Sequence, residues 1–202
     1  MQLCQARYGE NKSFTRLQNT IEDMQLLVDT LLAIARNTTK TLVAEQNKLS
    51  ELLAQLIHDL TAVSQSKGIQ INLQVDAQEQ LRQIYPSMTK MLFSNILRNA
   101  LNYSQGSQID VILQGNKVLI ADNGIGLPLP NDAKVQELSD RQLKLEVKGH
   151  GIGLQLVQKL CKQLQWRVEL FDREYYLTTH NDINLSLSTG LIVVVYLTDS
   201  VG

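Results

Sequence analysis

Three short segments contain the residue types in this chain that could do chemistry. In chain order they are Asn95-Ile-Leu-Arg-Asn99, Asp122-Asn-Gly-Ile-Gly126 and Gly149-His-Gly-Ile-Gly153. Each segment alone is a weak signal, because glycine-rich pieces recur by chance, but the ordered set is specific. Amide oxygens, a carboxylate and glycine-rich backbone are groups that bind a base, phosphates and a hard metal ion. The set therefore predicts a nucleotide site.

The two asparagines of the first segment are four residues apart in an apolar stretch with helical periodicity. Side chains at this spacing share one helix face, so Asn95 and Asn99 are expected to point two amide oxygens into one site. Carboxamide oxygens are hard ligands that suit Mg²⁺, an ion that also keeps waters and binds substrate phosphates. Helix capping or a hydrogen-bonded core pair are the alternatives that this segment alone leaves open.

The other two segments predict a base acceptor and a phosphate loop. Asp122 follows an apolar run, and a carboxylate at a strand end can accept a hydrogen bond from the exocyclic amine of adenine. Gly124 and Gly126 let the backbone approach a ring closely, although Asp-Asn-Gly is also a common turn sequence. Residues 149–153 precede a helical pattern, where free N–H groups and the helix dipole favour anions. ATP with Mg²⁺ is the ligand that this combination predicts.

Two other phosphate-binding folds do not fit these glycines. A dinucleotide-binding fingerprint requires a buried strand before the glycines and a third glycine three residues after the second. The residues before Gly149 are polar and the glycine spacing is different. A Walker-type Gly-Lys-Ser sequence is also absent from the chain.

The elements around the motifs predict an α+β fold. Ser50 is a candidate cap of an amphipathic helix that ends at Lys67-Gly68, and Pro86 starts the helix with the two asparagines. Gly115-Asn116 suits a tight hairpin. The expected strands are residues 41–46, 69–75, 108–114, 117–121, 166–171 and 191–198, and a further helix is expected at 151–165. These elements predict an α/β sandwich with a mixed, largely antiparallel sheet and helices on one face.

Residues 14–35 have a different pattern, in which apolar residues alternate at spacings of three and four. The seam consists of Phe14, Leu17, Ile21, Met24, Val28, Leu31 and Ala35. Such a seam requires a second helix to pack against, as in a bundle or a dimer. An amphipathic helix folded onto its own domain is the alternative. Polar residues 37–40 then predict a linker.

The composition excludes several classes of protein. The 202 residues have a net charge of −1, without the basic face that nucleic acid would require. The two cysteines, Cys4 and Cys161, lack metal-ligand spacing and fit a reducing compartment. The apolar run at 191–197 is far shorter than a membrane helix. We therefore expect a cytoplasmic domain, with any membrane anchor upstream of these residues.

The three motifs resemble the N, G1 and G2 boxes of sensor histidine kinases. Residues 92–103, 122–126 and 149–154 match these boxes in order and separation. The resemblance covers residues 41–202 as the catalytic ATP-binding domain of the GHKL (Bergerat) type, and residues 1–40 as the second helix of the dimerisation and phosphotransfer hairpin. It implies ATP and Mg²⁺ as cofactors, a response regulator receiver domain as partner and a homodimer through the hairpin. The implied parent protein is in the bacterial inner membrane.

The resemblance also implies the roles of single residues. By it Asn99 binds Mg²⁺, Asp122 hydrogen-bonds adenine and Tyr103 lies against the base. Asn95 is the implied catalytic position, where hydrolytic relatives keep a glutamate base. An amide cannot take a proton from water, which favours phosphotransfer over ATP hydrolysis. The ATP-binding positions that it implies are Asn95, Asn99, Asn102, Tyr103, Asp122, Gly124, Gly126, Lys148, Gly149, Gly151, Gly153 and Leu154.

Three features of the sequence depart from the family pattern. Asn102 stands where many relatives have a basic residue, so one charge contact to the phosphates is expected to be missing. Residues 127–148 should form the ATP lid but contain no phenylalanine. Residues 172–190 are longer than expected between two strands. Asn102 and the missing phenylalanine favour a regulatory pseudokinase with weak nucleotide binding as one alternative function. An anti-sigma-type protein-serine kinase, which shares the three boxes but would not need the heptad helix, is the other.

The phosphate-accepting histidine is expected upstream of these residues. His58-Asp59 has the start of an acceptor box but follows the heptad segment and lacks the usual continuation. We interpret His58 as a helix-surface or packing histidine. The chain alone is therefore expected to be unable to phosphorylate itself.

Overall fold

The computed structural model describes residues 44–126, 152–180, 183–186 and 188–198. The described residues belong to one compact unit, Val43–Gly202. Three sequence predictions lie outside the described residues: the heptad helix with its linker and domain boundary, the lid, and the loop that precedes Ile152.

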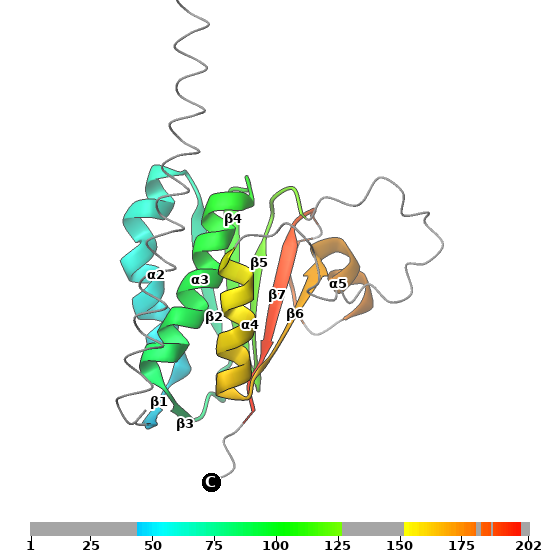
Figure 1. Cartoon of the computed structure of the whole chain (residues 1–202). Coiled ribbons are helices and arrows are strands. Elements are labelled where there is room, and N and C mark those ends of the chain that lie inside the picture. The colour runs from blue at the N-terminus through cyan, green and yellow to red at the C-terminus, as the bar shows by residue number, and fades with distance from the viewer. Residues whose placement is uncertain (1–43, 127–151, 181–182, 187, 199–202) are drawn as a thin grey trace, which may run out of the picture. The chain divides into compact units, whose positions relative to one another are not determined.

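In the described residues, five strands form the main sheet, in the order β2-β4-β5-β7-β6 (Figure 1). Their bounds are β2 Gln70–Val75, β4 Gln108–Gln114, β5 Lys117–Asp122, β6 Arg167–Asp172 and β7 Leu191–Tyr196. The β2–β4 pair is parallel and the other three pairs are antiparallel. The predicted mixed, largely antiparallel sheet is therefore confirmed. A separate small sheet pairs β1, Glu45–Asn47, with β3, Arg82–Ile84, a strand that the sequence did not predict.

Three helices lie side by side along one face of the sheet in Figure 1: α2 Leu49–Ser66, α3 Pro86–Tyr103 and α4 Ile152–Leu164. Pro86 occupies the first turn of α3, as predicted, because that turn needs no N–H donor there. Gly68 follows α2 with a φ of 66°, and Gly115 forms the β4–β5 turn with a φ of 54°. α3 and β5 both end at the upper end of Figure 1, where α4 starts.

Helix α2 is not capped by Ser50, so that prediction is wrong. Ser50 lies inside the first turn, and its backbone N donates to Oε1 of Glu79 at 2.8 Å. The Ser50 hydroxyl donates to the other oxygen of the same carboxylate. Glu79, from the connection between β2 and β3, therefore supplies the acceptor and the negative charge that a helix N-terminus favours.

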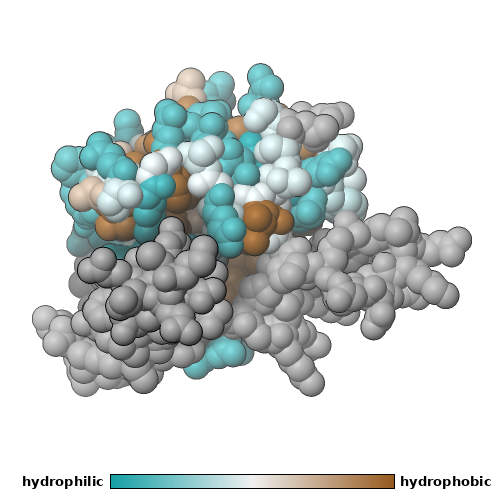
Figure 2. All heavy atoms as spheres, turned by 90° about the horizontal axis from the view of Figure 1, so that it is seen from above, coloured by the Kyte–Doolittle hydropathy of each residue, from teal (hydrophilic) through white to brown (hydrophobic). Residues whose placement is uncertain are grey.

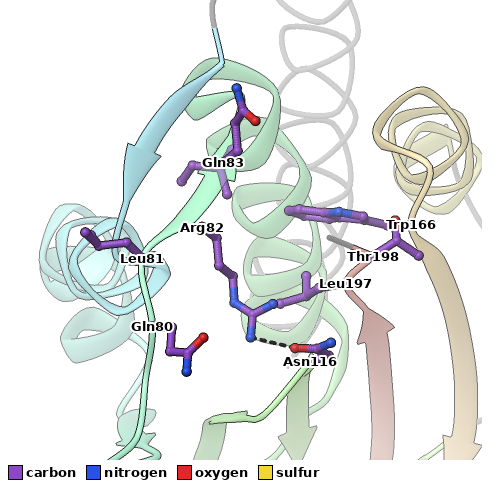
Figure 3. A pocket seen from close by; sticks show the side chains of 9 residues that line it. Gln80, Leu81, Arg82, Gln83, Asn116, Trp166, Leu197 and Thr198 are labelled. Carbon is purple, nitrogen blue, oxygen red and sulfur yellow. Dashed lines mark hydrogen bonds between the residues drawn. The ribbon is translucent and has the colours of Figure 1, made fainter. Parts of the chain in front are cut away.

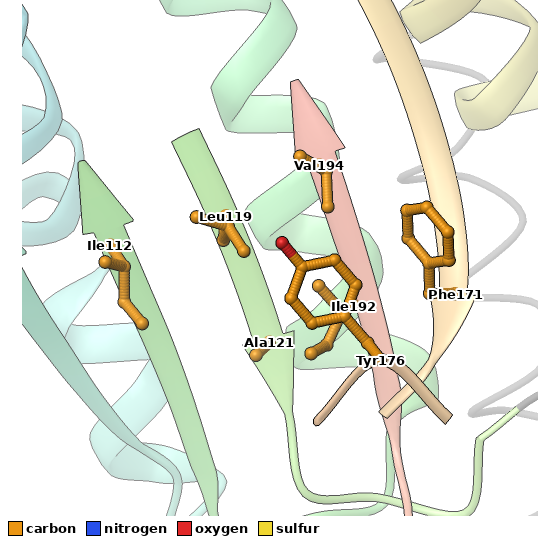
Figure 4. Close-up of a cluster of buried hydrophobic side chains, with 7 residues drawn as sticks. All are labelled: Ile112, Leu119, Ala121, Phe171, Tyr176, Ile192 and Val194. Carbon is orange, nitrogen blue, oxygen red and sulfur yellow. The ribbon is translucent and has the colours of Figure 1, made fainter. Parts of the chain in front are cut away.

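The sheet also has a buried apolar cluster on its other face. Leu119 and Ala121 alternate along β5 with Val118 and Ile120, so the two pairs point to opposite faces, and all four are buried. The cluster consists of Ile112, Leu119, Ala121, Phe171, Tyr176, Ile192 and Val194 (Figure 4). Tyr176 comes from α5, Arg173–Thr179, an unpredicted helix between β6 and β7. The predicted helices on one face are therefore present, but α5 covers part of the second face.

Two side chains outside the motifs differ in burial. Cys161 is buried in α4, and burial raises the pKa of its thiol to about 12, which makes the thiol unreactive. His58 is exposed on α2, as expected of a helix-surface histidine. Among the described helices, none has both the length and the hydropathy needed to cross a membrane.

Candidate nucleotide-binding site

Helix α3 holds the two asparagines in its C-terminal half. Asn95 is fully buried, and its Nδ2 donates to the backbone oxygen of Met91 at 2.8 Å. Its Oδ1 has no hydrogen-bond partner among the described residues. Buried acceptors are rarely left unpaired, so this oxygen is one that a water or a bound molecule can satisfy. Asn99, one turn later, is partly exposed.

Helix α4 begins directly against Asn99. A Cβ atom at Gly153 would lie 3.0 Å from both Oδ1 and Nδ2 of the Asn99 amide. A side chain at position 153 would therefore crowd the Asn99 amide, whereas glycine leaves space beside this amide. The structure thus brings the N box and the end of the G2 box together. Leu154 follows in the first turn of α4 and is partly buried.

Asp122 is the last residue of β5 and only 5% exposed. Its Oδ1 accepts hydrogen bonds from the backbone N of Gly124 at 2.9 Å and of Leu191 at 3.4 Å. The turn that follows is attached to the end of α3, because Ile125 N donates to Ser104 O at 2.9 Å. The approach is so close that a Cβ at Gly124 would lie 1.8 Å from Ser104 O. The Asp122 turn and the asparagine helix are therefore joined directly.

Burial raises the pKa of Asp122 above its ordinary value. Desolvation of the carboxylate is the largest cause, while the N–H groups of Gly124 and Leu191 and the charge of Arg173 act in the opposite direction. The carboxylate is therefore kept in a poorly solvated place, where a hydrogen bond from a ligand is worth more than it is in water.

Asp122→Asn should remove one source of pH-dependent stability. Because the pKa of Asp122 is raised in the folded state, the folded protein binds a proton at this carboxyl more tightly than the unfolded chain does. This contribution is fully present below the ordinary pKa of 3.8 and is lost as the pH rises through the folded pKa. As the pH falls from above the folded pKa towards 3.8, we expect the free energy of unfolding of the wild type to rise relative to that of Asp122→Asn. Urea unfolding at a series of pH values measures the difference, and a difference that stays flat below neutral pH would contradict a raised pKa.

Two more predicted residues, Tyr103 and Gly126, lie close in sequence to the contact between Ser104 and Gly124. Tyr103 is 51% exposed at the end of α3. Gly126 has a φ of 70°, and a Cβ on it would lie 3.2 Å from Gly190 O. Figure 2 shows this end of the domain from above, with hydrophilic side chains around a few apolar ones. The remaining predicted residues, which lie outside the described residues, are Lys148, Gly149 and Gly151.

Asn102 has an ammonium group beside it that comes from another helix. Lys67, at the C-terminal end of α2, donates from Nζ to Asn102 Oδ1 and, at 3.4 Å, to Leu101 O. The position that was expected to lack a charge contact therefore has a cation next to it. Sequence reasoning missed Lys67 because it lies 35 residues before Asn102.

Two further residues reach Asp122 from the β6–β7 connection. Arg173 donates from Nη1 to the backbone oxygen of Asp122 at 3.0 Å, and Gly190 packs against the same oxygen. The sequence did not single out either residue. The unexpected length of residues 172–190 was the only signal that this connection has a role.

A pocket lies at the end of the sheet opposite to the motif residues. This pocket of about 240 Å³ is lined by Gln80, Leu81, Arg82, Gln83, Ile84, Asn116, Trp166, Leu197 and Thr198 (Figure 3). Arg82 spans it and donates from Nη2 to Gly115 O at 2.6 Å and to Asn116 Oδ1 at 2.8 Å. None of the motif residues lines it, and it is smaller than ligand pockets of about 300–1,000 Å³. This pocket therefore gives no support for a nucleotide site at this end of the sheet.

Residues 86–198 match the family described as histidine kinase-, DNA gyrase B- and HSP90-like ATPase. The chain belongs to this ATPase family. The matched region starts at the first residue of α3 and extends past β7, so it includes Asn95, Asn99 and Asp122. An ATPase domain of this family binds ATP, and the recognition of a sensor histidine kinase ATP-binding domain is confirmed.

Individual relatives agree with the family match. Sensor protein QseC of Salmonella typhi is 31% identical over 156 residues, which are 76% of this chain and 35% of QseC. Sensor histidine kinase CpxA of Escherichia coli strain K12 is 25% identical over 174 residues, 80% of this chain and 37% of CpxA. The solved cytoplasmic segment of histidine kinase QseC has a TM-score of 0.58 at 24% identity, covering 86% of this chain and 91% of that one. The predicted fold is confirmed, while the chain spans little more than a third of these curated relatives.

Proposed function

We propose that this chain is the catalytic part of a two-component sensor histidine kinase, and that it transfers the γ-phosphate of ATP to a histidine. The observation that carries the proposal is the joint between Ser104 at the end of α3 and Gly124 after β5. This contact brings the part of α3 that carries Asn99 and the carboxylate of Asp122 to the same end of the domain. The partners would be a response regulator receiver domain and a second copy of the full-length protein, on the cytoplasmic side of a bacterial inner membrane.

The base, the metal ion and the phosphates each have a group that suits them. Asp122 would accept a hydrogen bond from the adenine amine, and the exposed ring of Tyr103 would pack on the base. Asn99 would hold Mg²⁺ through its amide oxygen, and this ion neutralises charge on the phosphates when it is bound. The N-terminus of α4 starts beside Asn99, where its free N–H groups favour phosphate oxygens.

Asn95 favours transfer over hydrolysis. It is fully buried, its Nδ2 is used by Met91 O, and an amide has no basic site that takes a proton from water at neutral pH. A water near the γ-phosphate is then not activated by this residue. The pseudokinase alternative rested partly on Asn102, and the neighbouring Lys67 ammonium provides a cation at that position.

Asn99→Ala should reduce the effect of Mg²⁺ on nucleotide binding. We expect ATP affinity in excess Mg²⁺ to fall about tenfold, as for a lost bond to a charged group, with a much smaller change in EDTA. Calorimetric titration of ATP with and without Mg²⁺ measures both affinities. Asn47→Ala on β1 is the matched control, because it removes an amide from a different sheet. An equal loss in Mg²⁺ and in EDTA would assign Asn99 a role other than metal binding.

Transfer itself is tested with γ-labelled ATP. We expect the 202-residue chain alone to remain unlabelled, and the full-length protein to gain an acid-labile phosphate that passes to a receiver domain. An acid-labile phosphate on His58 would overturn the assignment of an acceptor upstream. Release of free phosphate without any labelled histidine in the full-length protein would overturn transfer in favour of hydrolysis.

A further inference from the structure

The β6–β7 connection contains an arginine that is almost completely buried. Arg173 is the first residue of α5 and is 1% exposed. An arginine is rarely buried without partners, and its guanidinium stays charged at any ordinary pH. The contacts of Arg173 therefore show what this charge stabilises.

The guanidinium group connects three separate parts of the domain. Its Nη1 donates to the backbone oxygen of Asp122 at 3.0 Å, and its Nη2 donates to Ser186 O at 3.2 Å. Nη2 also forms an ion pair with Oδ2 of Asp110, at 3.7 Å. Asp110 is itself buried in β4 and accepts a hydrogen bond from Asn72 of β2 at 3.0 Å. The network therefore extends from the edge strand to the end of β5.

The same connection also holds the Asp122 side chain. Leu191 N donates to the carboxylate at 3.4 Å, and Arg173 N donates to Gly190 O at 3.0 Å. Gly190 has a φ of 139°, and a Cβ on it would lie 2.0 Å from Asp122 O. Tyr176, one turn after Arg173, anchors α5 in the apolar cluster of Figure 4. One segment thus fixes both the backbone and the carboxylate of Asp122.

We infer that the β6–β7 connection positions the adenine-recognising carboxylate of Asp122, and that Arg173 is the positioning residue that sets selectivity for adenine nucleotides. This inference rests on the proposed function. Hydrogen bonds weaken steeply with poor distance and angle, so a small displacement of Asp122 reduces recognition of the base amine. The guanidinium suits this role because its rigid planar fork holds the Nη1 and Nη2 donors at fixed angles.

The test compares adenosine diphosphate with inosine diphosphate, whose base lacks the exocyclic amine. We expect the wild type to prefer the adenine nucleotide. Arg173→Met should weaken adenosine diphosphate binding about tenfold and leave inosine diphosphate within about threefold, so that the preference is largely lost. Arg173→Lys, which keeps the charge, should restore part of the preference.

A second variant tests the same segment without removing the buried charge. Gly190→Ala keeps Arg173 but places a methyl group against Asp122 O, and we expect the same loss of preference. Gly115→Ala is the matched control, because it adds a methyl group at a positive φ with nothing within 4 Å, at the far end of the sheet. The Gly115→Ala variant should prefer adenosine diphosphate over inosine diphosphate as strongly as the wild type does. Thermal unfolding shows which variants are folded, and if Arg173→Met is not, Gly190→Ala decides.

The outcomes separate this inference from the proposed function. A wild type that binds neither nucleotide overturns both. A wild type that prefers adenine, together with folded variants that keep the preference, overturns the role of Arg173 alone. Equal weakening of both nucleotides in the Arg173 and Gly190 variants would also overturn it, because it would show a structural role without base selectivity.

Discussion

Asp122→Ala should lower the affinity for adenosine diphosphate by about 100-fold, the loss expected when a charge-assisted hydrogen bond of about 1.5–3 kcal/mol is removed together with part of its support. The carboxylate is buried at the end of β5 and accepts backbone N–H groups from Gly124 and Leu191. Truncation therefore removes the acceptor for the base and loosens the turn against α3. Calorimetric titration in excess Mg²⁺ measures the change.

A second substitution separates the two effects. Asp122→Asn keeps a side-chain oxygen that can accept from Gly124 N, but it removes the charge and places an N–H₂ group where an acceptor is needed. We expect this variant to keep its unfolding free energy near neutral pH and to lose most of the affinity that Asp122→Ala loses. Asp59→Ala, on the exposed face of α2, is the control and should bind normally. Affinity of Asp122→Ala within threefold of the wild type would show that this carboxylate does not bind the base.

The sequence predicted the parts of the site that depend on local chemistry. Pro86 begins α3, Gly115 turns the β4–β5 hairpin and Gly68 ends α2, because each requires only its own backbone preference. Asn95 and Asn99 fall on one helix for the same local reason. The strands around Asp122 were predicted from alternation and apolar runs, which are also properties of neighbouring residues.

The parts that the sequence did not predict depend on residues far apart in the chain. Glu79 replaces Ser50 as the acceptor at the start of α2 from 29 residues away. Lys67 lies beside Asn102, and Arg173 reaches Asp122 from 51 residues away. A charged residue in a sequence is usually solvated, so nothing local identifies Arg173 as buried. Such contacts follow from the packing of elements and not from the pattern of any one of them.

Gly124→Ala should both destabilise the domain and weaken nucleotide binding. A Cβ at this position would lie 1.8 Å from Ser104 O, and a backbone oxygen cannot move aside as a flexible side chain can. Overpacking of this kind costs about 1–3 kcal/mol of unfolding free energy. Because the turn must separate from α3 to relieve the contact, we also expect adenosine diphosphate to bind about tenfold more weakly, the equivalent of about 1.4 kcal/mol.

Gly115→Ala distinguishes this contact from the general effect of replacing a glycine. Gly115 has a φ of 54° with open space around it, so alanine there meets backbone strain of about 1–2 kcal/mol without any clash. Its stability should fall by a similar amount while its nucleotide affinity stays unchanged. Comparing urea unfolding and titration for the two variants therefore isolates the joint between Ser104 and Gly124. If Gly124→Ala loses stability but binds nucleotide like Gly115→Ala, the joint supports the fold alone, and the site assigned to this end of the domain is wrong.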